Sequence, residues 1–203
     1  MTPNSGIITV ISGPSGAGKG TVTRSLLTEP GYVLSVSVTT RPKRPAETDG
    51  VHYFFRTEQE FDELIAGGGL LEHMEYGGYR YGTPRSYAEQ QAAEGKTLIL
   101  EIDVAGALQV RQIYERCVLI FLIPPSIAEL EKRLRERNTQ SAASVKERLS
   151  IAEREITYAD RYDYIVMNDR VENAVDKIKT IVAAERLRPA YNRAVLESFF
   201  RKG

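Results

Sequence analysis

A glycine-rich stretch near the amino terminus carries the clearest chemical signal in the chain. Residues 13–20 read Gly-Pro-Ser-Gly-Ala-Gly-Lys-Gly and directly follow an apolar, β-branched run at 7–11. Glycines let several backbone N–H groups point into one small cavity, where they bind phosphate oxygens. A helix expected at 19–27 adds the positive end of its dipole. The pattern G-x-x-x-x-G-K in this setting predicts a phosphate-binding loop (P-loop), in which Lys19 reaches the β- and γ-phosphates.

The residue after this lysine departs from the usual pattern. Ser or Thr normally follows the lysine and binds Mg²⁺, whereas this chain has Gly20 and then Thr21. Coordination of Mg²⁺ by Thr21 is therefore left open, and the ion is expected to be held mostly by phosphates and water. The order Gly-Lys-Gly-Thr resembles the loop of nucleoside monophosphate kinases more than that of GTPases.

A second group of candidate residues lies at 39–55, where arginines and tyrosines are spaced along the chain as T-T-R-x-x-R-x-x-E-x-x-G-x-x-Y-x-F. Alone, two arginines and a tyrosine more often form solvated surface. Together with the P-loop, the pattern resembles the guanylate kinase family, and the resemblance runs from Ile7 to about Leu187. It also includes Glu72 in Leu-Leu-Glu, Tyr81-Gly-Thr83, Glu101-Ile-Asp103, Pro124-Pro-Ser126, Arg133 with Arg137, Arg148-Leu-Ser150, and Asn168-Asp169.

The resemblance implies an ATP:GMP phosphotransferase (ATP + GMP = ADP + GDP) that serves purine nucleotide metabolism and GMP recycling, with Mg²⁺ accompanying ATP. The implied fold is α/β: a P-loop NTPase core whose five-stranded parallel sheet is flanked by helices, with an inserted GMP-binding lobe and a small lid. We expect one domain, 1–203, with the core at about 1–34, 95–132 and 150–203, the lobe at about 35–94 and the lid at about 133–149.

The family's functional residues fall on matching positions of this chain. The ATP-binding set implied in this way is Gly13, Pro14, Ser15, Gly16, Ala17, Gly18, Lys19, Gly20, Thr21, Arg133, Arg137 and Asn168. For GMP, the resemblance implies a phosphate grip by Arg41, Arg44, Tyr53 and Tyr81, and guanine reading by Ser37, Glu72, Thr83 and Asp103. The implied catalytic cations are Lys19, Arg41, Arg133, Arg137 and Arg148.

Three of these assignments have plainer alternatives. Thr83 precedes Pro84, so its hydroxyl could equally cap the next helix. Asp103 ends a buried strand, where it could hold Mg²⁺ through water instead of reading guanine. Arg133 and Arg137 are one helical turn apart, a spacing that is also typical of a solvated charged face.

The chemistry of these residue types suits the implied reaction. Phosphoryl transfer needs the phosphate charges neutralised and the oxygens aligned in line, and arginine forks bind phosphate bidentately. The acceptor phosphate is already largely ionised, so no general base is required. Guanine's N1–H and N2–H₂ donors suit the carboxylates Glu72 and Asp103, whereas adenine would meet them with a bare N1 acceptor.

Apolar periodicity supplies the elements that must position these residues. Short apolar runs at 7–11, 97–102, 117–123 and 164–167 alternate with helical patterns, which predicts a parallel sheet covered on both faces. Residues 35–94 do not follow this alternation of strand and helix patterns. Capping-box pairs predict helix starts at Thr57/Glu60, Ser126/Glu129 and Ser144/Glu147. A last long helix is expected from about Val171 towards Leu187, followed by an amphipathic piece with Leu196, Phe199 and Phe200 that packs on the core or mediates self-association.

Composition excludes several classes of protein. The 27 Lys+Arg balance the 27 Asp+Glu among 203 residues, which argues against nucleic-acid coating or membrane-surface binding. One cysteine and two histidines provide no internal disulfide and no metal-ligand spacing. We expect no signal peptide or transmembrane segment, and therefore a cytoplasmic protein. The oligomeric state, monomer or homodimer, is left open.

Two other functions compete with the kinase interpretation. One is a non-catalytic guanylate-kinase-like module that binds protein ligands. Such modules usually have a degraded loop and lid, whereas Lys19, Arg133, Arg137 and Arg148 are all present here. The other is a kinase for a different nucleoside monophosphate, which the pairing of Glu72 with Asp103 disfavours.

Overall fold

A sheet of five parallel strands forms the centre of the molecule. The computed structural model describes residues 6–136 and 142–200, except the side chains of 142–144 and 193–196. The strands run in the order β2-β7-β1-β8-β9, and each neighbouring pair is parallel. Their bounds are β1 Ile7–Ser12, β2 Tyr32–Leu34, β7 Thr97–Glu101, β8 Cys117–Ile123 and β9 Tyr164–Met167. The predicted α/β class with a central parallel sheet is therefore confirmed.

Helices cover both faces of this sheet, which explains why its strands are nearly continuous apolar runs. On one face, α1 (Lys19–Leu26) and α7 (Val171–Glu185) pack on alternate strand residues such as Ile7 and Ile99. On the other face, α3 (Arg85–Ala93) and α4 (Val104–Ile113) pack on residues such as Ile8 and Leu98. Every residue of β1 is buried between these layers.

The four strands expected from apolar runs are all present. The fifth, β2, was implied only by the family resemblance, because its own residues form no distinct pattern. It has three residues and lies at the edge of the sheet, where none of them is fully buried. Short edge strands carry a weak sequence signal because one side of the strand needs no apolar partner.

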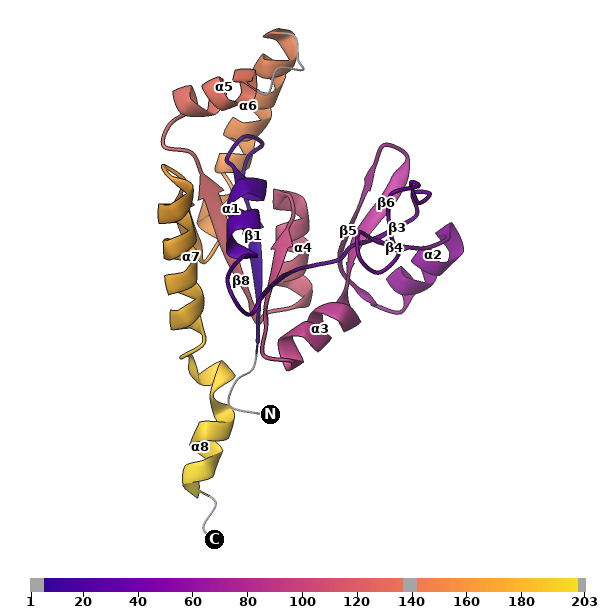
Figure 1. Ribbon diagram of the computed structural model, residues 1–203, viewed down its shortest axis with the longest axis vertical. Helices are drawn as coiled ribbons and strands as arrows, with labels where there is room; N and C mark the ends of the chain where they lie inside the picture. Colours follow the sequence, from indigo (N-terminus) through magenta and orange to yellow (C-terminus); the bar gives the residue numbers. More distant parts are fainter. Residues whose placement is uncertain (1–5, 137–141, 201–203) are drawn as a thin grey trace.

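A second sheet lies beside the first, within residues 35–94 (Figure 1). Its strands run in the order β4-β3-β6-β5. Helix α2 (Glu58–Ala66) packs on it through Phe61, and Arg80 of β6 pairs with Glu58 and Asp62 of that helix. The strand bounds are β3 Val38–Thr39, β4 Phe54–Phe55, β5 Leu70–Tyr76 and β6 Tyr79–Pro84.

Helices α5 (Ile127–Glu136) and α6 (Ala142–Ile156) pack together beyond the end of the parallel sheet where α1 begins (Figure 1). Their shared apolar cluster includes Leu130, Leu134 and Ala152. Ser126 caps α5 by accepting the Glu129 N–H at 3.1 Å, as predicted. The predicted start of α6 at Ser144 is wrong, because Ala142 is already helical. Alanines favour the helix strongly enough to extend it past such a cap.

The predicted capping box of α2 is confirmed, since Thr57 and Glu60 exchange both hydrogen bonds. Helix α7 ends at Glu185, two residues before the expected limit. Two single-turn 3₁₀ helices lie at Ala159–Arg161 and Pro189–Tyr191, and α8 (Arg193–Phe200) extends away from the body (Figure 1). Its Phe199 is 80% exposed. Among the described residues, no helix is both long and apolar enough to cross a membrane.

Candidate active site

The P-loop joins the end of β1 to the start of α1, as predicted. Gly13, Gly16 and Gly18 adopt positive φ angles of 137°, 92° and 92°. A side chain is excluded at Gly13, because its Cβ would lie 2.1 Å from the Leu122 carbonyl oxygen. At Gly18 a Cβ would lie 2.3 Å from Asn168 Nδ2. The glycine spacing is therefore required both by backbone conformation and by close neighbours.

Lys19 bends back over this loop. Its Nζ donates to the carbonyl oxygens of Gly13 at 2.5 Å and Pro14 at 3.2 Å. The ammonium therefore lies beside the backbone N–H groups that the sequence analysis assigns to phosphates. An ammonium has three donors on a flexible stem, so it can exchange these carbonyls for phosphate oxygens without a change in the loop.

A cavity of about 610 Å³ connects the P-loop to the second sheet. Residues from the two predicted binding regions line the same space, although they lie far apart in the sequence. The P-loop side contributes Gly13, Ser15, Gly16, Gly18, Lys19 and Gly20. The opposite side contributes Ser37, Tyr53, Glu72, Met74, Tyr76, Tyr81 and Gly82, and Glu101, Ile102, Asp103 and Glu155 complete the lining.

Glu72 and Thr83 face each other from the paired strands β5 and β6. Both are nearly inaccessible, with exposed fractions of 4% and 1%, and the Thr83 hydroxyl donates to Glu72 Oε1 at 2.7 Å. Burial raises the pKa of the Glu72 carboxyl, and the nearby charge of Asp103 adds to this, whereas the Thr83 hydrogen bond opposes it.

The alternative that Thr83 caps the next helix is wrong. Strand β6 continues through Pro84, and α3 begins at Arg85 with Pro84 in the capping position and no side-chain cap. Thr83 is thus still a strand residue, and its hydroxyl points to the partner strand. Its partner in the structure is a carboxylate, not the backbone of α3.

Asp103 has a local role that the sequence analysis missed. It caps α4, and its carboxylate accepts the Gly106 N–H at 2.8 Å. The signal was present, because an aspartate stands directly before a helical stretch. A Cβ at Gly106 would lie 3.2 Å from Glu72 Oε2 and 3.3 Å from Asp103 Oδ1. Both carboxyl groups therefore converge on this glycine.

Arg41 is held in place by an acid and two rings. Its guanidinium contacts Glu47 at 2.7 Å and lies 5.4 Å from the Tyr53 ring centroid and 5.8 Å from that of Phe55. Glu47 also accepts the Arg44 backbone N–H, whereas the Arg44 side chain is exposed. Tyr53 and Tyr81 meet edge to face at 6.0 Å. The structure thus gathers Arg41 and both tyrosines. Glu47, which the sequence analysis quoted without a role, positions Arg41.

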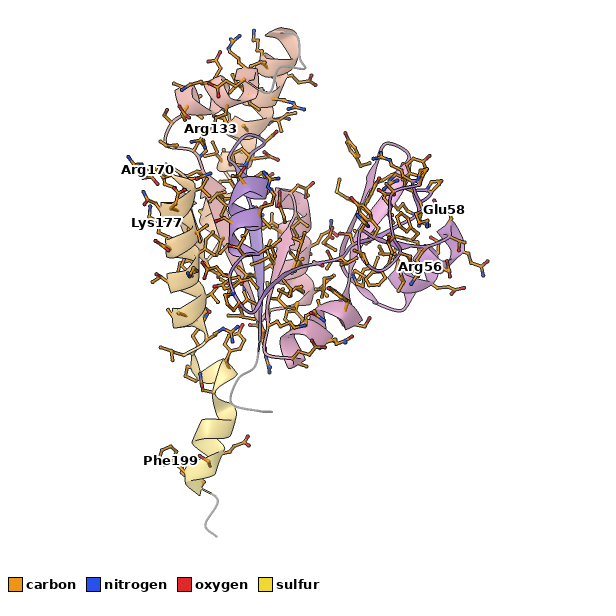
Figure 2. All side chains as sticks on the ribbon, in the orientation of Figure 1. Arg56, Glu58, Arg133, Arg170, Lys177 and Phe199 are labelled. Carbon is orange, nitrogen blue, oxygen red and sulfur yellow. The ribbon has the colours of Figure 1, made fainter. Side chains whose placement is uncertain are left out.

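A second hollow of about 320 Å³ lies against another part of the P-loop. Asn168 is buried there and its Nδ2 donates to the Ala17 carbonyl at 2.8 Å. Arg133, on α5 (Figure 2), donates to Glu129 at 2.9 Å and to the Asn168 carbonyl at 3.1 Å. Thr21 lines this hollow too. The structure therefore joins Arg133, Asn168 and the P-loop.

Three of the predicted cations that the structure describes, Arg41, Arg44 and Arg148, are not among the residues that line either cavity. Arg148 is half-buried on α6 and does not occur among the described residues that line them. Arg137 lies outside the described residues. Within the described ranges, no group of three or more His, Cys, Asp or Glu residues could hold a metal ion.

Six lining residues of the larger cavity were not predicted: Met74, Tyr76, Gly82, Glu101, Ile102 and Glu155. Glu101 stands in a segment that carried the resemblance, at the end of β7. Glu155 had no signal of its own, because an acidic residue in a charged helix usually faces solvent. In the structure, burial raises the pKa of the Glu155 carboxyl, and the charge of Lys19 opposes that shift.

Comparison with known proteins agrees with this geometry. The family model described as guanylate kinase matches residues 6–185. Guanylate kinase from Oceanobacillus iheyensis is 48% identical over 189 residues, which cover 93% of this chain and 92% of the relative. The Bacillus subtilis guanylate kinase is 49% identical over 185 residues, 90% of this chain and 91% of the relative. The crystal structure of guanylate kinase from Anaplasma phagocytophilum superimposes with a TM-score of 0.72 at 35% identity, covering 98% of both chains. The chain belongs to the guanylate kinase family.

Proposed function

We propose that this protein transfers the γ-phosphoryl group of ATP to GMP, giving ADP and GDP. The observation that carries the proposal is the single cavity of about 610 Å³ that the P-loop shares with Tyr53, Glu72 and Tyr81. A phosphate donor on the loop and an acceptor on the second sheet would meet in that space, as an in-line transfer requires. Membership of the guanylate kinase family supports the choice of GMP as acceptor.

ATP would bind with its phosphates on the P-loop. Backbone N–H groups of 13–19 and the start of α1 would hold the β- and γ-phosphates, and Lys19 would move onto them from the Gly13 and Pro14 carbonyls. Asn168 and Arg133 line the second hollow against the same loop. We assign that hollow to the adenosine side of ATP.

GMP would bind with its phosphate at Arg41, Arg44, Tyr53 and Tyr81. Arg41 is already oriented by Glu47, so its guanidinium needs little reordering to bind phosphate. Glu72 would accept guanine N1–H and N2–H₂, with Asp103 beside it and Ser37 as a donor to guanine. A hydroxyl has one proton, and Thr83 already donates its proton to Glu72. We therefore assign Thr83 chiefly to the orientation of Glu72.

Transfer itself would need no base from the protein. A GMP phosphate oxygen, already ionised, forms the new bond to the γ-phosphorus, while the bond from that phosphorus to the β–γ bridging oxygen breaks. Lys19 and Arg41 would offset the charge between the two nucleotides, and Arg133, Arg137 and Arg148 would join them from a lid at about 133–149. We retain about 35–94 as the GMP-binding lobe and about 1–34, 95–132 and 150–203 as the core.

The cavity residues fit Mg²⁺ brought with ATP. No three of the described acidic residues could hold the ion together, but single carboxylate oxygens such as that of Asp103 line the cavity near the P-loop, and oxygen donors suit this hard cation. Mg²⁺ keeps several waters, so it would be held mostly by phosphates, with Asp103 as a candidate for a contact through water. Thr21, which lines the other hollow, would have to reorient. When bound, the ion supplies charge neutralisation to the phosphates.

The test is a coupled assay of ADP release with ATP and each of GMP, AMP, CMP and UMP in turn. We expect turnover with GMP far above the others. ADP release with a different monophosphate would reassign the acceptor, and no release with any of them would favour a protein-binding module. The reaction would serve purine nucleotide metabolism, including GMP recycling, in the cytoplasm, where we expect both substrates.

A further inference from the structure

Helix α4 lies between the parallel sheet and β5 of the second sheet (Figure 1). It contacts β1 and β8 as well as β5. The proposed reaction assigns a role only to the residue that caps this helix, Asp103. Yet α4 meets three consecutive residues of β5, which are Leu71, Glu72 and His73. The middle one of these is the proposed reader of guanine.

The first of these contacts is apolar. Leu71 is fully buried and belongs to the same cluster as Ala107 and Val110 of α4. The pairing of β5 with β6 shifts between Leu70 and Glu72, so β5 has one extra residue at this point. Such a bulge re-aims the side chains beside it. Leu70 packs within the second sheet's own cluster, so β5 is held against α4 by the residue directly before Glu72.

The second contact is the close approach of Gly106 to the Glu72 carboxyl. A Cβ at Gly106 would lie 3.2 Å from Glu72 Oε2, so a side chain here would push against that carboxyl. The φ angle of Gly106 is not positive, so the backbone conformation does not demand glycine. Glycine also weakens a helix relative to alanine. The physical reason for glycine at this position is therefore the space that Glu72 and the capping carboxylate occupy.

The third contact is polar. Gln109, one turn after Gly106 on α4, accepts the His73 N–H through its Oε1 at 3.1 Å. Strand β5 is at the edge of its sheet, where outward N–H groups have no neighbouring strand. Because His73 is exposed, water could satisfy this N–H equally well. Satisfaction of the strand edge therefore does not by itself require a glutamine.

We propose that Gln109 is a positioning residue for the choice of nucleotide base. From α4 it holds the β5 backbone directly after Glu72, while Gly106 leaves room for the Glu72 carboxylate. The same helix begins after Asp103, so one rigid element sets the positions of both carboxylates relative to each other. A base whose two donors lie side by side requires acceptors that are fixed in this way. This inference rests on the proposed function of the site.

The test removes the acceptor and keeps the length of the side chain. In Gln109→Met, the His73 amide should lose its protection from hydrogen exchange, measured by NMR, because its partner is gone. The value of kcat/KM for GMP should fall about fivefold, close to the usual net contribution of one hydrogen bond. The fall should lie mainly in KM for GMP. Both kcat/KM for AMP and KM for ATP should stay within about twofold of the unmodified protein.

Three further variants make the result specific. Gln112→Met makes the same replacement at an exposed glutamine of the same helix, and it should change neither the exchange at His73 nor the GMP/AMP ratio of kcat/KM. Gln109→Glu keeps an oxygen acceptor for the His73 N–H and should restore both. Gly106→Ala should lower the GMP/AMP ratio by displacing the Glu72 carboxylate, without lowering the unfolding temperature, because alanine favours the helix.

The outcomes separate a positioning role from a structural one. An unchanged GMP/AMP ratio in Gln109→Met, with the His73 amide deprotected, would overturn the proposal, because the contact would then serve only the strand edge. Equal losses with GMP and AMP would also overturn it, since general damage to the fold gives that result. If Gln109→Met does not fold, Gly106→Ala carries the test, and an unchanged ratio in that variant contradicts the proposal.

The proposed function can fail separately from this inference. Failure of the unmodified protein to phosphorylate GMP would refute the proposed function. Hydrogen exchange at His73 in the Gln109 and Gln112 variants would still report whether α4 holds β5, because that measurement needs no substrate.

Discussion

The two sides of the cavity are built by different means. The P-loop side is made mostly of backbone: closely spaced glycines at positive φ, N–H groups and one helix start. The opposite side is made mostly of side chains from β5 and β6 and from the residues just before β3 and β4, with Asp103 from the start of α4. The P-loop side is formed by one short, continuous segment. The opposite side is formed only when the second sheet has folded and packed beside the parallel sheet.

This difference also predicts different responses to mutation. On the P-loop side, a single cation supplements many backbone donors, so its loss should affect catalysis with any acceptor. On the sheet side, we propose that each carboxylate binds particular atoms of one base, so its loss should affect the choice of acceptor. The following variants test that contrast, beginning with the largest expected effect.

Lys19→Ala should abolish detectable turnover while leaving the fold intact. The change removes a charge that we propose stabilises the transferring phosphoryl group, and loss of one such group typically costs about 10²–10³-fold in kcat. ADP release and thermal unfolding should be measured on the same preparation. The P-loop assignment would be refuted by a soluble, folded Lys19→Ala protein with near-normal activity. Equal losses with GMP and AMP are expected.

Glu72→Gln should weaken kcat/KM for GMP by about 1–3 kcal/mol, the worth of a good bidentate base contact. AMP should be penalised far less, because it never made that contact, and the new amide N–H₂ can donate to adenine N1. The comparison of kcat/KM for both acceptors gives the answer. A GMP/AMP ratio equal to that of the unmodified protein would mean that this carboxylate is structural. Asp103→Asn in the same assay distinguishes base reading from a uniform effect through Mg²⁺.

The pH dependence of GMP binding should report Glu72 directly. Burial raises its pKa above the ordinary 4.5, so the accepting carboxylate is lost as the pH falls through this raised value. The affinity of the unmodified protein should therefore fall towards that of Glu72→Gln on acidification. Because both proteins bind the same GMP, protonation of its phosphate cancels in the ratio. A ratio that does not change with pH would contradict ionised Glu72 as the reader.

The same shift has a consequence for stability. Because the pKa of Glu72 is raised in the folded state, its protonated carboxyl adds to the free energy of unfolding. This contribution is complete below pH 4.5 and is lost as the pH rises through the folded-state pKa. At neutral pH, burial of the ionised Glu72 carboxylate therefore lowers the free energy of unfolding. The Glu72→Gln protein should unfold at a temperature no lower than that of the unmodified protein. Calorimetry checks this, and marked destabilisation at neutral pH would contradict it.

Thr83→Val should have the smallest effect. It removes the hydrogen bond to Glu72 Oε1, and bonds to charged groups contribute about 1.5–3 kcal/mol, of which only the part that orients Glu72 reaches GMP. We expect about a fivefold fall in kcat/KM for GMP, roughly 1 kcal/mol, with KM for ATP unchanged. An equal loss with AMP would show that Thr83 supports the sheet and not the reading of guanine.

The contrast between the two sides also explains what could be predicted from sequence. The P-loop, the four apolar strands and the caps at Thr57 and Ser126 depend on neighbours within a few residues, and they were found from the residues themselves. The arrangement of Glu72 against Thr83 depends on the register of β5 with β6, and only the family resemblance pointed to it.

The features that sequence reasoning missed share a physical cause. Strand β2 is short and lies at an edge, so it carries little apolar pattern. Glu155 looks like a surface charge until α6 packs beside the P-loop. Asp103 stands before a helical stretch, which indicates a cap, but the same position matches a guanine-reading residue of the family and suits a Mg²⁺ contact, and these ligand roles obscure the cap. Ser144 fits a capping pattern within a helix that already includes Ala142.

The most direct test of the account is a competition experiment with a bisubstrate analogue, adenosine and guanosine joined through a polyphosphate chain. If the P-loop and the second sheet share one reaction cavity, calorimetry should give one analogue bound per chain, and saturating ATP or saturating GMP should each displace it. Its inhibition of ADP release should be competitive against both substrates. Competition with only one nucleotide, or two analogues bound per chain, would contradict the claim that phosphoryl transfer takes place between these two sides.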